Sequence, residues 1–114
     1  MKKDITVYLN DILESIEAIE EYTENITGKD FNSNRQVQDA VIRRLEIIGE
    51  AVKNIDEDFR NKYPRIPWKK IAGFRDVLIH EYSGVKIERV WNVIEKDLRP
   101  LKTEIKKLVK KKKS

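Results

Sequence analysis

The sequence contains no cysteine and a single histidine, His80, among its 114 residues. The lack of cysteine excludes disulfides, thiolate metal sites and a cysteine nucleophile. With one imidazole as well, a zinc site built from the ligands of one chain is not expected. We therefore expect neither a metal nor another cofactor. A thiol-free chain fits a reducing compartment, and we place the protein in the cytoplasm.

Long uncharged stretches are also missing. No run approaches the roughly 18 residues that a membrane-spanning helix needs. The first seventeen residues hold no apolar segment of the kind found in signal peptides before their acids begin. We expect no membrane association.

No segment shows the polar–apolar alternation of a strand. Apolar residues instead recur at steps of three and four along most of the chain. This pattern predicts an all-α antiparallel bundle of four to five helices in a single domain, residues 1–114. The helices are expected over 4–27, 34–62, 74–82 and 86–109, with a helical turn inside 64–73 and a frayed basic tail over 110–114.

Several residues mark the expected helix ends. Asp4 suits an N-cap, and Gly28 suits a C-terminal stop. Ser33 with Gln36 matches a capping box for the second helix. These positions set the boundaries of the first two predicted helices.

Only four glycines and three prolines occur, so each one inside a helix needs a reason. Gly49 lies in the middle of the second helix and predicts close approach of a neighbouring helix. Pro100 predicts a kink in the last helix. Trp68 and Trp91 sit in apolar patterns and are expected in the core, although either could stack on a base.

The net charge of +4 combines two halves of opposite sign. Residues 1–60 hold eight basic and fourteen acidic residues, and residues 61–114 hold sixteen and six. The basic half suggests an anionic partner such as RNA, which Lys69 and Lys70 could steer. Solvated helix surfaces would give the same composition.

The octapeptide RDVLIHEY, residues 75–82, places four polar groups in an otherwise apolar segment. In one interpretation Arg75 and Asp76 are surface charges, His80 bonds to Asp76 one turn earlier, and Tyr82 is an amphipathic edge residue. In the other interpretation Arg75 clamps a phosphate and His80 exchanges a proton near neutral pH, oriented by Asp76. Those groups suffice for RNA cleavage by the ribose 2′-hydroxyl without a metal.

Geometry limits the functional interpretation. Residues five apart on an ideal helix point about 140° from each other, so Arg75 and His80 do not share a face. Such cleavage also needs an acid and a base, and the chain has one histidine. Two copies meeting at this helix would resolve both difficulties, and the functional interpretation therefore predicts a homodimer.

Residues 75–82 match the R-x4-H-x-Y motif of the HEPN superfamily. Together with PWKKIAG before it and YLNDILESIEAIEEYT, QDAVIRRLEIIGEAVKNI and VWNVIEKDLRPLK elsewhere, the motif makes the chain resemble the HepT-like toxins of HepT/MntA toxin–antitoxin pairs over about residues 4–105. The lysine-rich tail is additional to that resemblance.

The resemblance implies an all-α dimeric, metal-independent ribonuclease. Arg75 and His80 would be the catalytic pair, and Asp76 would occupy the polar position after the arginine. Tyr82 would be the tyrosine that a nucleotidyltransferase antitoxin of the MntA type modifies with AMP. On an ideal helix Arg75 and Tyr82 lie within about 20°, so a phosphodiester on Tyr82 could occupy the arginine's phosphate site.

Two alternatives stay open. The chain could be a non-catalytic helical adaptor that binds a nucleotidyltransferase or a nucleotide, or a purely structural bundle. Glu46 and Glu50 could pair as metal-binding carboxylates, or they could bridge to Arg43 and Lys53 on the helix surface.

Overall fold

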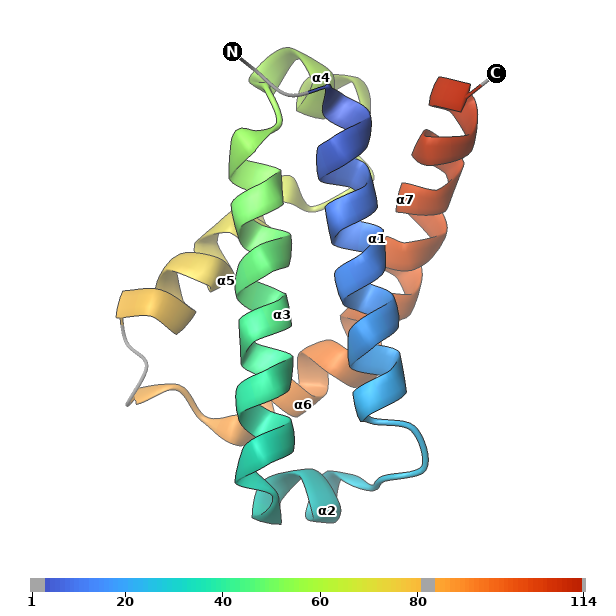
Figure 1. The fold of residues 1–114 in the computed structure, drawn as a ribbon. Coiled ribbons are helices and arrows are strands. Elements are labelled where there is room, and N and C mark those ends of the chain that lie inside the picture. Colours follow the sequence, from blue (N-terminus) through green and yellow to red (C-terminus); the bar gives the residue numbers. More distant parts are fainter. Residues whose placement is uncertain (1–3, 81–83, 114) are drawn as a thin grey trace.

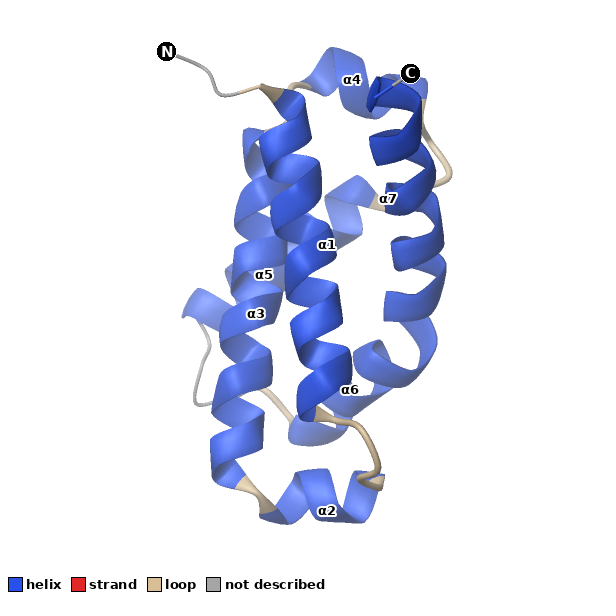
Figure 2. Cartoon of the chain, turned by 45° about the vertical axis from the view of Figure 1, so that its right-hand side comes forward, coloured by secondary structure: helices blue, strands red, loops and turns tan. Residues whose placement is uncertain are grey.

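The computed structural model describes residues 4–80 and 84–113, and within them every regular element is helical (Figure 2). This confirms the all-α prediction. None of the helices in those ranges has the length and apolar character that a membrane crossing requires. In chain order the elements are α1 (Ile5–Tyr22), α2 (Gly28–Ser33), α3 (Arg35–Asn54), α4 (Glu57–Lys62), α5 (Trp68–His80), α6 (Ile87–Asn92), the π-helical segment η2 (Val93–Asp97) and α7 (Leu98–Lys113).

The longer helices lie side by side in the order α5, α3, α1, α7 (Figure 1). α1 packs on both α3 and α7, and α3 carries α5 on its other side. α1 and α3 run antiparallel because the short α2 reverses the chain between them (Figure 1). The apolar stripes meet in one core, whose fully buried members include Leu9, Ile12, Ile16, Ile19, Phe31, Val41, Val52, Val90 and Ile105.

The first helix begins as predicted and ends early. Asp4 is the N-cap, and its carboxylate accepts a hydrogen bond of 2.8 Å from the Thr6 N–H. The helix ends at Tyr22, and Asn25 takes a left-handed conformation with φ of 63°. Gly28 begins α2 and does not stop α1, because Thr27 forms a capping box with Asp30.

The predicted helix over 34–62 is two helices. The cap of α3 is Asn34, whose side chain accepts from the Val37 N–H, and not Ser33. The chain leaves the helix after Asn54, and Asp56 caps α4 by accepting from the Phe59 N–H at 2.8 Å. The Asp56 carboxylate accepts a backbone N–H that a continuous helix would bond to a backbone carbonyl, which explains the break.

α5 starts earlier than predicted. It begins at Trp68, directly after Pro67, and continues through Gly73 without a break. Trp68 is 6% exposed, and its indole N–H lies within hydrogen-bond distance of the carbonyls of Arg60 and Tyr63. Trp68 is thus the core anchor that the sequence predicted, and it fixes the start of the helix that carries Arg75 and His80.

The last predicted helix is divided into α6, η2 and α7. At the C-terminal end of η2, the Leu98 N–H donates to the Val93 carbonyl five residues earlier. The widened turn lies just before Pro100, which has no N–H and cannot complete a regular helical bond.

α7 continues to Lys113, so it includes residues 110–113 of the tail that we expected to be frayed. Lys111 and Lys112 lie over the rings of Tyr63 and Phe59, at 5.5 and 5.8 Å from the ring centroids.

Candidate functional site

Gly49 lets α5 approach α3 closely. A Cβ built on Gly49 would lie 2.1 Å from the Cβ and 2.7 Å from the Cγ of Arg75. No real side chain fits such distances, so only glycine permits this contact. The close approach that a mid-helix glycine predicted is confirmed, and the residue that makes the approach is Arg75.

Arg75 is held by two carboxylates. Its Nη2 lies 2.7 Å from Glu50 Oε2 on α3, and its Nη1 donates to Asp76 Oδ1 at 3.0 Å. The side chain is 20% exposed, and Nε is buried with no hydrogen-bond partner among the described residues. The guanidinium therefore has a fixed orientation on the surface of α3.

Asp76 joins this cluster and is not hydrogen-bonded to His80. Its Oδ1 also accepts a hydrogen bond of 2.9 Å from the Lys53 ammonium. The bond from Lys53, and then the bond from Arg75, lower the pKa of Asp76 below its ordinary value. No hydrogen bond joins Asp76 to His80 among the described residues, so Asp76 orients the arginine and not the imidazole.

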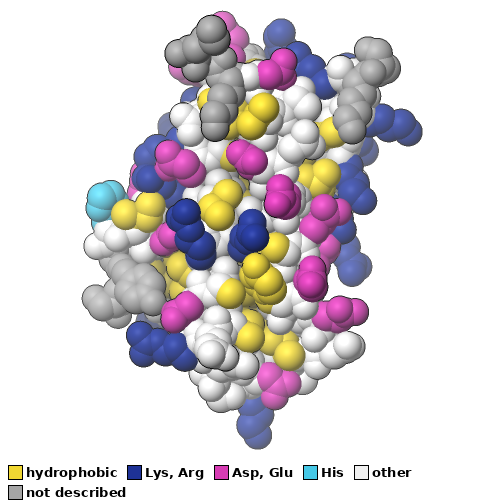
Figure 3. Space-filling model, viewed as in Figure 1, with side chains coloured by type: hydrophobic (Ala, Val, Ile, Leu, Met, Phe, Trp, Pro, Cys, Tyr) yellow, Lys and Arg dark blue, Asp and Glu magenta, His cyan; other side chains and the backbone are white. Residues whose placement is uncertain are grey.

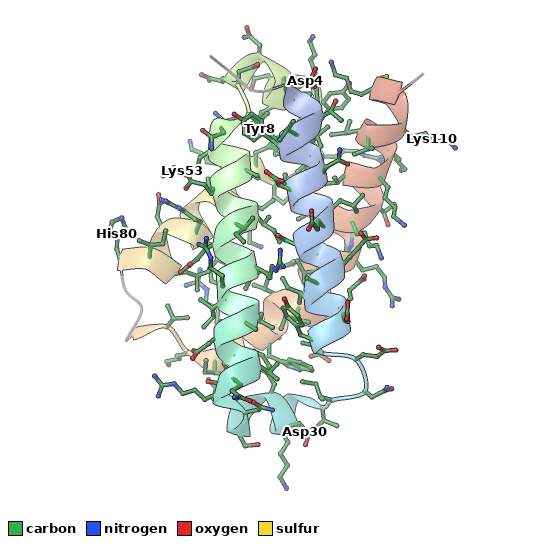
Figure 4. All side chains as sticks on the ribbon, viewed as in Figure 1. Asp4, Tyr8, Asp30, Lys53, His80 and Lys110 are labelled. Carbon is green, nitrogen blue, oxygen red and sulfur yellow. The ribbon has the colours of Figure 1, made fainter. Side chains whose placement is uncertain are left out.

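His80 lies at the C-terminal end of α5, exposed and at the edge of the molecule away from α3 (Figure 4). Arg75, five residues earlier, faces α3 through Gly49 and Glu50. One chain therefore does not bring the two groups onto one face. Lys69 and Lys70 are exposed in the first turn of α5, roughly 15 Å along the helix from His80.

Two further predictions meet different outcomes. Tyr82 lies outside the described residues, so its position relative to Arg75 stays a prediction.

The two glutamates of α3 were expected to bridge to Arg43 and Lys53. Glu46 does lie 3.6 Å from Arg43, but Glu50 pairs with Arg75, and Lys53 pairs with Asp76. The sequence offered one signal that Glu50 would be the partner of Arg75, since Glu50 directly follows Gly49, the glycine that predicted the close approach.

A pocket of about 450 Å³ opens beside Arg75, between α1, α3 and α5. Three acids, Asp11, Glu46 and Glu50, line it against two arginines, Arg43 and Arg75. Figure 3 shows the same mixture of basic and acidic side chains on this face. This balance does not favour an anion, so a phosphate would need further positive charge from outside the single chain.

The family model described as "Ribonuclease HepT-like" matches residues 12–108, which span α1 to α7 and include Arg75 and His80. The chain belongs to the HepT-like ribonuclease family. The octapeptide, residues 75–82, lies within the matched range.

Relatives of this HepT-like chain also have ribonuclease in their names. A probable ribonuclease HepT of Thermococcus cleftensis is 48% identical over 110 residues, which cover 96% of this chain and all of that protein. A Methanocaldococcus jannaschii protein named a gamma-glutamylcyclotransferase and candidate RNase is 55% identical over 109 residues. The match covers 96% of this chain but only 49% of that longer protein. No solved structure gives a significant match.

Proposed function

We propose that the chain is a metal-independent endoribonuclease toxin in which Arg75 and His80 act on RNA. The observation that carries the proposal is the octapeptide's placement in a HepT-like domain: Arg75 is oriented by Gly49 and Glu50, and His80 is exposed at the end of the same helix. The names of the relatives support the reaction class.

The reaction is an internal transfer of phosphorus. The ribose 2′-oxygen bonds to the adjacent phosphorus, and its proton passes to a base. The bond from phosphorus to the 5′-oxygen breaks, and that oxygen takes a proton from an acid. The products are a 2′,3′-cyclic phosphate and a free 5′-hydroxyl. Arg75 stabilises the charge on the phosphoryl oxygens, and His80 carries a proton.

We propose that the working site is composite and lies between two copies of the chain. In one copy Arg75 faces α3 while His80 lies at the exposed C-terminal end of α5. The pocket beside Arg75 is lined by more acidic than basic side chains. A second copy that meets α5 would supply the missing imidazole and positive charge. α5 also exposes Ile79, which is 41% accessible, as an apolar contact for such a copy.

Inhibition is proposed to act at Tyr82. A nucleotidyltransferase antitoxin of the MntA type would transfer AMP from ATP, so that the phenolic oxygen bonds to the α-phosphorus, pyrophosphate leaves and the phenolic proton goes to solvent. The added phosphodiester is anionic and bulky, and it would compete with RNA for Arg75. The pair would then form a type VII toxin–antitoxin system.

The test is cleavage of RNA by purified chain in the presence of a metal chelator. The parent should release 2′,3′-cyclic phosphate ends. Arg75→Ala should lower the rate about 10²–10³-fold, as removal of one oxyanion donor does, and His80→Ala should abolish cleavage. Arg99→Ala, which removes an exposed cation of α7, is the matched control and should cleave like the parent.

Folded His80→Ala that cleaves as well as the parent would remove His80 from the mechanism. Cleavage only with an added metal would remove the metal-independent reaction. Native mass spectrometry of the same sample reports the dimer and any AMP on Tyr82 in one measurement, which tests the assembly and the modification separately from the chemistry.

A second candidate function is a non-catalytic adaptor that binds a nucleotidyltransferase or a nucleotide. The specific observation in its favour is that both Nη atoms of Arg75 already contact carboxylates, Glu50 and Asp76, in the single chain. A phosphate has to compete with these carboxylates for the guanidinium. An assembled dimer without RNA cleavage, but with nucleotidyltransferase binding, would support the adaptor.

A further inference from the structure

A cavity of about 480 Å³ lies on the side of α3 and α5 that faces α6, η2 and α7. Its walls are mainly apolar side chains, principally Leu45 and Ile48 of α3, Ile71 and Phe74 of α5, and Leu98 and Leu101 of α7. The volume falls in the range of small-molecule sites, about 300–1,000 Å³. Neither Arg75 nor His80 lines it, so the cavity is separate from the proposed ribonuclease site.

The rim of the cavity is positively charged. In the part of the chain that the structure describes, four basic residues line it against two acidic ones, which leaves +2. Arg65 is paired with Glu104 at 3.8 Å. The exposed Lys70, Arg89 and Lys96 remain against the exposed Asp97.

Arg89 connects the rim to the apolar wall. Its guanidinium lies 4.9 Å from the centroid of the Phe74 ring, which holds a cation directly above the apolar surface. The π-helical segment contributes Val93 to the wall and Lys96 to the rim. Single π-helical turns inside α-helices occur frequently at functional sites.

The chemistry of the walls selects among anions. Among the described residues that line the cavity, Asn92 is the one neutral polar side chain, so the edges of a nucleobase would lose most of their hydrogen bonds with water there. A hydrocarbon body loses nothing comparable and gains from burial. Charge complementarity at the rim then requires an anionic head group.

We propose that this cavity is a binding site for an amphipathic organic anion, with an aliphatic body between α5 and α7 and a carboxylate at the rim formed by Lys70, Arg89 and Lys96. The site does not depend on the proposed ribonuclease activity, and its failure would leave that activity untouched.

The test uses decanoate as the probe, titrated into the full chain by isothermal calorimetry below its micelle-forming concentration. One decanoate should bind per chain. Decyltrimethylammonium, which has the same hydrocarbon body and the opposite charge, should not bind. Equal binding of both probes, or binding of neither, would overturn the proposal.

Charge reversal at the rim locates the site. Lys96→Glu should weaken decanoate binding about fivefold, because one attraction becomes a repulsion. Lys106→Glu makes the same change on an exposed lysine of α7 that does not line the cavity, and it should change the affinity less than about twofold. Equal effects of the two variants would show that decanoate responds only to net charge.

A second copy of the chain is the competing occupant. Val93→Phe places a ring in the cavity and should abolish decanoate binding while the sedimentation coefficient stays that of the parent. A change of oligomeric state in this variant would identify the cavity as a subunit interface and overturn the proposal.

Discussion

At the scale of residues, the orientation of Arg75 depends on α3 as well as on its own helix. Gly49 makes room for its Cβ, Glu50 holds its Nη2 at 2.7 Å, and Asp76 holds its Nη1. Lys53 balances the charge of this cluster by bonding to Asp76. The octapeptide supplies only Arg75 and Asp76, whereas α3 supplies Gly49, Glu50 and Lys53.

The lowered pKa of Asp76 predicts a pH dependence of stability. A carboxyl with a folded-state pKa below its unfolded value stabilises the fold above the unfolded pKa, and this stabilisation is lost as pH falls through the folded value. Asp76→Asn should therefore lower the free energy of unfolding near pH 7 and flatten its decline in acid. Urea unfolding measured between about pH 2 and 7 checks both effects.

The control is Glu95→Gln on η2, which removes an exposed carboxylate away from Lys53 and Arg75. An Asp76→Asn curve parallel to that of the parent would show that the bonds from Lys53 and Arg75 do not form in solution.

At the scale of elements, the contact between α3 and α5 depends on a single missing methyl group. Gly49 and Gly73 are both inside helices, but a Cβ on Gly73 would meet nothing within 4 Å. The two glycines therefore form a matched pair: one is required by packing, and the other is not.

Gly49→Ala should destabilise the protein, because the clash with Arg75, of the size of other overpacked sites at about 1–3 kcal/mol, outweighs the gain in helix propensity of about 1 kcal/mol. Gly73→Ala should stabilise it by about 0.5–1 kcal/mol, since only propensity changes. Chemical denaturation gives both values. Stabilisation of similar size by both changes would mean that α5 is not docked on α3 in solution.

At the scale of the whole molecule, the charge asymmetry of the sequence becomes a division in space. Acidic side chains gather over α1, and basic side chains line the edge formed by α7 (Figure 3). α5, which carries Arg75 and His80, lies at the opposite edge from α7 (Figure 1). α7 is therefore not the basic surface next to Arg75, and further positive charge for the proposed ribonuclease site would come from a second copy.

A composite site predicts complementation between inactive variants. A mixed dimer of Arg75→Ala with His80→Ala keeps one complete site, made of Arg75 from one chain and His80 from the other. After subunit exchange the mixture should recover roughly a quarter of the parent activity, because half of the dimers are mixed and each has one site of two. RNA cleavage before and after exchange measures this.

Each variant alone, exchanged with itself, is the control and should stay inactive. A mixture that stays inactive although mass spectrometry detects mixed dimers would place both catalytic groups in the same subunit, or would require both copies of each.

The sequence by itself determined the helical class, the N-cap of α1 at Asp4, the buried Trp68 and the close approach at Gly49. These follow from local rules: the spacing of apolar residues, a side chain that caps its own helix, and a glycine whose absent Cβ has to have a use. The helix breaks near residues 23–27 and 55–56 were not predicted. The apolar pattern continues past both breaks, but Thr27 and Asp56 cap new helices there.

Only the tertiary structure decided which charges meet. Glu50 was expected beside Lys53 on its own helix, and His80 beside Asp76 on its own helix. Instead Glu50 bonds to Arg75, and Asp76 to Lys53, across α3 and α5. Several partners lie within reach of a long charged side chain along one helix, so sequence spacing leaves the choice open. The packing of a second helix, which here depends on a glycine, settles it.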